Sequence, residues 1–342
     1  MSSIIIVCAF YYGAWYSLNY FGLEVNLKYL MYLFLITCLF TAFSNQLGVT
    51  DFYEFADDSL KEESRQAGLF GNPNEAGNFG AYLLGILLTC SILLKKNKIL
   101  YLILGLFAFY VAFVSFSKAA IAVSFILIFS YLLYNLINVL KIGKRNRTVL
   151  LQSFVIFLLS IFMLFANWEG IFQSFSQPQQ KRAIAFFLLL QGEVNDRTTS
   201  DRTIAFAQGW RLIRQSPIIG SGFGSFHRFV VGKLKLGVHN TYLLILGEGG
   251  AFILFLFLLI GIVFIFRTLK LKNFALKYFV YSFCCVFFIS VCGTGHNALY
   301  DRVSNALFAI VISVIAYDFQ ELHLIPRHKY YHYLEDKLHI QS

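Results

Sequence analysis

The chain has 342 residues, of which 58% are hydrophobic and 13% charged, and its formal net charge is +10. A soluble domain carries about 25% charged residues, so the composition excludes an ordinary soluble protein and indicates a polytopic membrane protein. The positive charge does not indicate nucleic acid binding, because the lysines and arginines cluster between apolar runs, as they do in loops that set membrane orientation. The six cysteines lie mostly within apolar runs without a CxxC pair, which indicates neither a disulfide framework nor a metal site.

Nine apolar stretches have roughly the length that a bilayer requires, about 20 residues. They are residues 3–21, 27–48, 76–94, 99–116, 119–140, 148–166, 240–266, 275–293 and 298–317. The sequence therefore predicts an all-α fold of about nine transmembrane helices, with a large helical extracytoplasmic loop between spans six and seven. No basic stretch precedes the first run, which is expected to be a retained span and not a cleaved signal.

Three clusters of lysine and arginine fall in loops that alternating spans place on one side of the membrane. Their members are Lys95, Lys96 and Lys98; Lys141, Lys144, Arg145 and Arg147; and Arg267, Lys270, Lys272 and Lys277. Positive loops mark the cytoplasm, so 141–147 is expected inside, whereas the N-terminus and the loops 49–75 and 167–239 are expected outside. An outward N-terminus with an odd number of spans is unusual and leaves open further spans upstream.

The spans divide the chain into four expected regions. These are an N-terminal transmembrane bundle at 1–166 with the acidic outer loop 49–75, an extracytoplasmic cap at 167–239, C-terminal transmembrane helices at 240–317, and a cytoplasmic tail at 318–342. Within the cap, AIAFFLLL at 183–190 is too short to span, and we expect it to lie at the interface or to re-enter the membrane.

Lys118 divides an apolar stretch from Ile99 to Leu140 that is about twice the length of one span. Two interpretations stay open: a tight hairpin at Ser115–Lys118, in which the lysine snorkels or binds a ligand, or a charge inside the membrane that needs a partner. Upstream, GNPNEAG at 71–77 leads into the third span. Asn74 is expected to cap that helix, with a substrate contact as the alternative.

The longest segment without the pattern of a transmembrane helix begins at Ser200. Ser200 or Asp201 is expected to cap a helix that ends before Pro217. Its apolar stripe consists of Phe206, Trp210 and Ile213. Helical spacing places Arg202 on this stripe and Arg211 on the opposite, water-facing side. The glycines at 220, 222 and 224 predict a flexible turn after the helix.

His239 and Asn240 open the span at 240–266. The positive end of the helix dipole disfavours imidazolium, so a neutral His239 is a candidate general base, and an interfacial histidine without a role is the alternative. Glu248 follows nine residues later and is expected on the opposite face, as a buried hydrogen-bond partner or packing acid beside glycines. His296, before Asn297, is a reserve candidate. No motif for a metal, nucleotide or cofactor is present.

Four stretches of the chain, taken together and in their order along the sequence, resemble the O-antigen ligase and polymerase superfamily of bacterial membrane glycosyltransferases. They are GNPNEAGNFGAYLL at 71–84, SFSKAAI at 115–121, DRTIAFAQGWRLIRQSPIIGSGFGSF at 201–226 and HNTYLLILGEGGAFIL at 239–254. The resemblance implies glycan transfer on the outer face of the cytoplasmic membrane, from an oligosaccharide on undecaprenyl diphosphate to a glycan acceptor, without a metal or cofactor.

The resemblance also implies roles for three residues. The family arginines that hold the diphosphate match Arg202 and, by position, Lys118, and the family histidine matches His239. The hairpin position is usually arginine in this family. Lysine keeps the charge but loses the bidentate fork.

The first functional hypothesis is a polymerase that joins repeat units of an O-antigen, capsule or exopolysaccharide, with a flippase and a chain-length regulator as partners. The alternative is a ligase that moves the finished glycan to lipid A core or to protein. A transporter, which should show charged residues facing each other along several spans or paired broken helices in repeated halves, ranks lower, because intramembrane charge is sparse and the polar residues are concentrated in one outer loop. An inactive family member is the remaining hypothesis, favoured by Lys118 and by the unusual N-terminal topology.

Overall fold

The structure is a computed structural model that describes most of the apolar helices of the chain. The described residues are 2–43, 70, 73–94, 97–142, 202–225, 230–231, 234–235, 240–271, 273–294 and 302–321, with the single positions 173, 180, 184 and 188.

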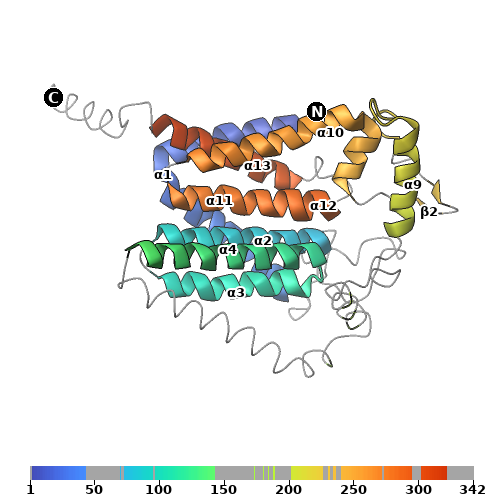
Figure 1. Ribbon diagram of the computed structural model, residues 1–342. Coiled ribbons are helices and arrows are strands. Elements are labelled where there is room, and N and C mark those ends of the chain that lie inside the picture. Colours follow the sequence, from blue (N-terminus) through green and yellow to red (C-terminus); the bar gives the residue numbers. More distant parts are fainter. Residues whose placement is uncertain are drawn as a thin grey trace.

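The described residues form a bundle of helices with one short pair of strands (Figure 1). The helices are α1 (Ser2–Phe43), α2 (Pro73–Leu93), α3 (Lys98–Val114), α4 (Lys118–Ile142), α9 (Arg202–Gln215), α10 (Thr241–Lys270), α11 (Phe274–Cys284), the π-helix η4 (Cys285–Val291), α12 (Cys292–Thr294) and α13 (Arg302–Glu321). The strands β1 (Val230–Val231) and β2 (Leu234–Lys235) pair antiparallel.

Within the described residues, five helical segments are long and apolar enough to cross a membrane. They are Val7–Ala42, Pro73–Leu93, Lys118–Ile137, Thr241–Lys270 and Phe274–Thr294. The apolar segments Lys98–Val114 and Ser304–Asp318 are shorter. Each predicted span corresponds to one of these helices, except 148–166, which lies outside the described residues. The chain is therefore a multi-pass membrane protein, and the count of nine spans stays a prediction.

Helix α1 contains a sharp turn that divides it into two segments. Gly22 has non-helical backbone angles, φ 78° and ψ 171°, inside the helix. Residues 2–21 and 23–43 are therefore separate helical segments, and they correspond to the predicted spans 3–21 and 27–48. The turn places both segments beside the rest of the bundle, where α1 packs against α13 and α2.

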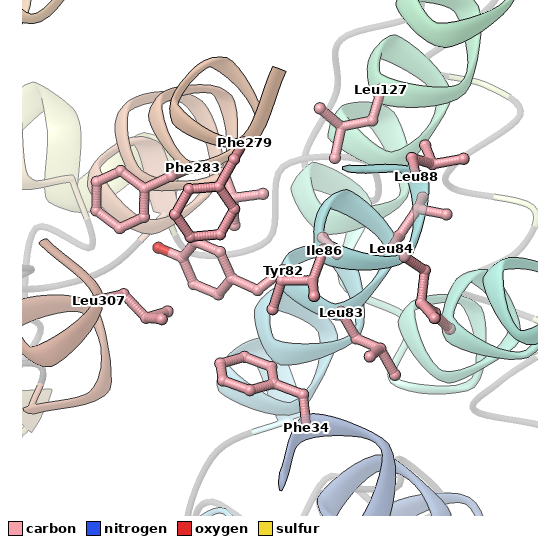
Figure 2. Packing of buried hydrophobic residues seen from close by; sticks show 14 of the residues in the cluster. Phe34, Tyr82, Leu83, Leu84, Ile86, Leu88, Leu127, Phe279, Phe283 and Leu307 are labelled. Carbon is pink, nitrogen blue, oxygen red and sulfur yellow. The ribbon is translucent and has the colours of Figure 1, made fainter. Parts of the chain in front are cut away.

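Helix α2 is the buried centre of the bundle. Of the 18 residues in its most apolar stretch, 89% are buried, whereas only 6% of the corresponding stretch of α10 is buried. Figure 2 shows Tyr82 and the leucines of α2 meeting Phe34 of α1, Leu127 of α4, Phe279 and Phe283 of α11, and Leu307 of α13. The rings of Tyr82 and Phe283 stack at 5.8 Å. A helix that is apolar all round, as α2 is, must be covered on every side, and its neighbours provide that cover.

The connections of the helices define two ends of the bundle. One end carries the hairpin between α3 and α4 at Ser115–Ser117 and the beginning of α2. The opposite end carries the beginning of α3, the end of α4, and the turn between α10 and α11 (Figure 1). The described members of the basic clusters are Lys98, Lys141, Arg267, Lys270 and Lys277, and their helix positions place them at this second end. Alternating spans predict this grouping.

Candidate active site

Lys118 lies at a tight hairpin, which is the first of the two interpretations of its sequence. Phe116 turns the chain with a left-handed φ of 51°. The buried Ser115 hydroxyl donates to the Ala112 carbonyl at 2.7 Å and accepts from the Ser117 backbone N–H at 3.3 Å. Lys118 is the first residue of α4 and is partly exposed, whereas both serines are buried. The hairpin therefore holds the lysine at the end of the bundle.

The beginning of α2 packs directly on this hairpin. A Cβ added to Gly77 would lie 2.8 Å from the Cβ of Ser117 and 3.2 Å from that of Ala120. This close approach explains why the GNPNEAG segment contains a glycine at that position. Asn74 is partly exposed and lies in the first turn, after Pro73 begins the helix. The predicted cap is therefore wrong, because proline already occupies the first helical position.

Two polar contacts join α2 and α10 to the π-helix at the same end. The Ser290 hydroxyl of η4 donates to Asn78 Oδ1 of α2. The Tyr242 hydroxyl of α10 donates to the Phe288 carbonyl at 2.6 Å. Asn78, Tyr242 and Ser290 were not found by sequence reasoning, since isolated polar residues in apolar runs are common. The signal that could have found Asn78 is its place in the motif at 71–84, and π-helices often accompany functional sites.

Asn240 has a structural part in this arrangement. Its Oδ1 accepts from the Leu243 backbone N–H at 3.0 Å, which caps α10, and its Nδ2 donates to the Gly293 carbonyl at 3.3 Å. His239 immediately precedes it and lies outside the described residues, as do His296 and almost all of 183–190. The cap nevertheless fixes where the chain enters α10, because Asn240 is tied both to its own helix and to α12.

Helix α9 lies across the end of the bundle and packs on the first turns of α10 (Figure 1). Ile213 and Leu244 are buried together, with Phe206 packed against them. Trp210 is 47% exposed, so its predicted place on the packed stripe is wrong; the buried Gly209 takes that place. Glycine permits a closer approach of the helix than tryptophan would. Arg211 is exposed, as expected for the opposite face.

Arg202 is the first residue of α9. Helical spacing puts it in phase with Phe206 and Ile213, the residues that face α10. Its side chain lies outside what the structure describes. If the loop before α10 folds back as a cap, the sequence also predicts that Arg202, His239 and Lys118 share one outer cavity, and this stays a prediction.

The span predicted at 240–266 is broken. Gly250 has φ 75° and ψ −179°, so α10 consists of a short arm, 241–249, and a long arm, 251–270. Figure 1 shows the two arms running in different directions. Glu248 lies near the end of the short arm and is 8% exposed, which agrees with the predicted buried acid. The single continuous helix is wrong because its Gly-Glu-Gly-Gly run also allows a turn.

A second segment, Pro217–Ser225, is bound to this break, and we call it the strap. Within it, the Ser221 N–H donates to the Gly247 carbonyl at 2.8 Å and the Gly222 N–H to the Glu248 carbonyl at 3.0 Å. In return, the Ala251 N–H donates to the Pro217 carbonyl at 2.9 Å. The predicted flexible turn is therefore a docked segment. Its hydrogen bonds satisfy backbone groups that a broken membrane helix would leave without partners.

Close backbone contact requires glycine on both sides of this junction. A Cβ on Gly220 would lie 2.6 Å from the Gly250 nitrogen, and a Cβ on Gly250 would lie 2.6 Å from the Ile219 carbonyl carbon. Such distances are not found for real Cβ atoms, and these neighbours are backbone atoms that cannot rotate away. The spacing P-x2-G and E-x-G in the sequence is therefore the signature of one contact between the strap and α10.

Comparison with known proteins points to the same part of the chain. Residues 100–258 match the family described as O-antigen ligase, and no curated protein or solved structure matches the chain. The match begins in α3, includes the hairpin, α9 and the strap, and ends shortly after Gly250 in α10. Residues 100–258 are thus similar to the O-antigen ligase family, and this match supports the resemblance of the chain to the O-antigen ligase and polymerase superfamily.

Proposed function

We propose that the protein is a glycosyltransferase that joins lipid-linked oligosaccharide repeat units on the outer face of the bacterial cytoplasmic membrane. The donor is an oligosaccharide on undecaprenyl diphosphate, and the acceptor is a sugar hydroxyl of a second glycan. The observation that carries the proposal is the O-antigen ligase match over residues 100–258, which contains the hairpin of Lys118, α9 with Arg202, and the entry to α10 at His239.

The proposed reaction needs fixed positive charge where the diphosphate leaves. Lys118 begins α4, so its ammonium adds to the partial positive charge of the helix amide groups at the same end. Arg202 begins α9, which rests on the short arm of α10. We infer that these two cations bind the diphosphate, because cations held in place stabilise the charge that develops on the leaving oxygen.

The bond changes are those of a displacement at the anomeric carbon. The acceptor hydroxyl oxygen forms a bond to that carbon while the bond to the diphosphate oxygen breaks. His239 accepts the hydroxyl proton, and the diphosphate leaves as an anion. The entry to α10 supports this role, since Asn240, the residue after His239, is hydrogen-bonded to Leu243 and Gly293.

We also propose, from the sequence prediction, where the regions of the chain lie relative to the membrane during this reaction. Residues 1–166 and 240–317 form the transmembrane parts, 167–239 lies outside over the site, and 318–342 lies in the cytoplasm. A flippase that supplies the donor and a regulator of chain length are the protein partners that a polymerase of this kind requires.

The charge hypothesis is tested with two lysines that occupy the same helix position at opposite ends. Lys118 begins α4 and Lys98 begins α3. In purified protein supplied with lipid-linked oligosaccharide, Lys118→Ala should abolish glycan transfer, Lys118→Arg should retain it, and Lys98→Ala should match the unaltered chain. Full transfer by a well-folded Lys118→Ala protein would show that the lysine only closes the hairpin.

The roles of Arg202 and His239 differ, and so do the losses we expect. Arg202→Ala should slow transfer by about 10²–10³, as removal of one anion-stabilising donor does. His239→Ala should slow it by about 10²–10⁴, with a defect that eases as pH rises and the hydroxyl is deprotonated more readily by solvent. Arg211→Ala is the matched control, because Arg211 is exposed on the same helix. An Arg211→Ala defect equal to that of Arg202→Ala would contradict the site.

A ligase is the second candidate, favoured by the description of the matched family. It uses the same site but passes the finished glycan to lipid A core or to protein. A deletion strain distinguishes the two. Loss of a polymerase leaves single repeats on the lipid, whereas loss of a ligase leaves long lipid-linked chains that reach no final acceptor.

A further inference from the structure

The strap displays the most exposed large hydrophobic side chains in the part of the chain that the structure describes. Ile218 is 70% exposed, Ile219 82% and Phe223 88%. Their backbone is held firmly by the junction with α10, so this exposure belongs to an ordered segment. Three large, exposed apolar groups thus lie within six residues of one segment, and we call them the apolar patch of the strap. Exposed apolar groups gathered in this way mark a contact with lipid or protein.

The position of the strap relative to the membrane follows from the helix to which it is bonded. The Pro217 carbonyl accepts from the N–H of Ala251, the first residue of the long arm of α10. The most apolar 18 residues of Thr241–Lys270 have a mean hydropathy of 2.9, and only 6% of them are buried within the protein. None of the residues of the long arm is buried. Its surface, including Phe252 and Phe255, therefore faces lipid.

The length of the long arm sets the depth of the strap. Residues 251–270 rise by about 1.5 Å each, which spans roughly the 30 Å of a hydrocarbon core. Arg267 and Lys270 are basic residues in the last turn of this arm and belong at one membrane interface. The strap, bonded at the other end of the arm, must then lie at the opposite interface.

The neighbouring side chains of α9 also suit a lipid interface. Trp210 and Arg214 lie one helical turn apart, and both are exposed. Tryptophan favours the level of the lipid headgroups, and arginine binds phosphate. Arg211 and Gln215 lie on the side of α9 opposite the buried Ile213, where helical spacing directs them away from the bundle.

We propose that the strap anchors α9 to the bilayer. Ile218, Ile219 and Phe223 insert into the outer interface of the membrane, with Trp210 at headgroup level and Arg214 on a lipid phosphate. A bilayer is favoured over a protein partner because the patch is bonded to the end of an arm that itself faces lipid. The anchor would help to hold α9 against the short arm of α10. It does not depend on the reaction proposed above.

The test uses spin labels on the full chain in nanodiscs of phosphatidylethanolamine and phosphatidylglycerol. The exposed Cys8 is replaced by serine, and single cysteines are introduced as Ile219→Cys and Phe223→Cys. Phe255→Cys on the long arm is the lipid reference, and Gln215→Cys is the aqueous reference. Collision with oxygen, which concentrates in lipid, is compared with collision with a water-soluble nickel chelate.

Labels at 219 and 223 should favour oxygen over nickel, as at 255, whereas the label at 215 should favour nickel. Preference for nickel at 219 and 223 would place the strap in water and overturn the proposal. Labels that are immobile and shielded from both reagents would also overturn it, because they would show cover by a protein surface.

Discussion

Two glycines interrupt helices of this protein with almost the same backbone angles, yet for different reasons. Gly22 has φ 78° and ψ 171°, and Gly250 has φ 75° and ψ −179°. A Cβ on Gly22 would meet nothing within 4 Å, whereas a Cβ on Gly250 would overlap the backbone of Ile218 and Ile219. The first position requires glycine for its backbone conformation alone. The second requires it also for contact with the strap.

The two breaks also satisfy their backbone groups in different ways. At Gly22 a side chain does so: Asn26 Nδ2 donates to the Gly22 carbonyl at 2.6 Å and to the Ser17 carbonyl at 3.0 Å. At Gly250 the backbone of the strap does so, through residues about 30 positions upstream. A break inside a membrane protein thus needs new partners, and these are found either locally or by tertiary contact.

The largest effect is expected from Gly250→Ala. The residue would have to hold a backbone conformation that costs about 1–3 kcal/mol without glycine, and the strap would also have to leave its place. We expect a loss of about 3 kcal/mol or more, seen as a large fall in the thermal unfolding midpoint in detergent. Protease cleavage within the strap should increase. An unchanged midpoint and an uncleaved strap would refute the contact.

A smaller effect is expected from Gly22→Ala, which carries only the conformational cost of about 1–3 kcal/mol. Its thermal midpoint should fall less than that of Gly250→Ala, and its glycan transfer should stay normal at low temperature. If both variants lose the same stability, the difference in packing at the two breaks has no energetic consequence.

Asn26→Ala should destabilise the first break by about 1–2 kcal/mol, because it removes the donors to the Gly22 and Ser17 carbonyls. Its effect should not add to that of Gly22→Ala, since both act on one turn. Thermal unfolding of the two single variants and the double variant measures this coupling. Simple additivity would mean that Asn26 does not act through the turn.

The smallest effect is expected from Ser221→Ala. The Ser221 hydroxyl donates to the Gly247 carbonyl at 2.9 Å, but the Ser221 backbone N–H bonds the same carbonyl at 2.8 Å and would remain. We expect a loss of about 0.5–1 kcal/mol in thermal unfolding. A loss comparable to that of Gly250→Ala would show that the side chain, and not the backbone, holds the strap.

Much of the site could be predicted locally. The helix before Pro217 ends at Gln215 as predicted, because proline disfavours helix in the residue before it. The hairpin at Lys118 was one of two interpretations of a 42-residue stretch from Ile99 to Leu140 that exceeds one span, and the structure decided between them. The face of α9 that packs on α10 was harder to predict. Trp210 fits the apolar period, yet Gly209 is buried instead, since the shape of α10 decides which side can approach closely.

The sequence by itself determined that this is a multi-pass helical membrane protein, which stretches are apolar helices, and which family its motifs resemble. Hydropathy and span length are local properties, so they can be read along the chain. Only the tertiary structure decided that α2 is the buried centre while the more apolar α10 lies at the periphery, and that α10 breaks at Gly250. Both outcomes depend on residues distant in sequence: neighbouring helices bury α2, and the strap supplies the hydrogen bonds that the broken helix lacks.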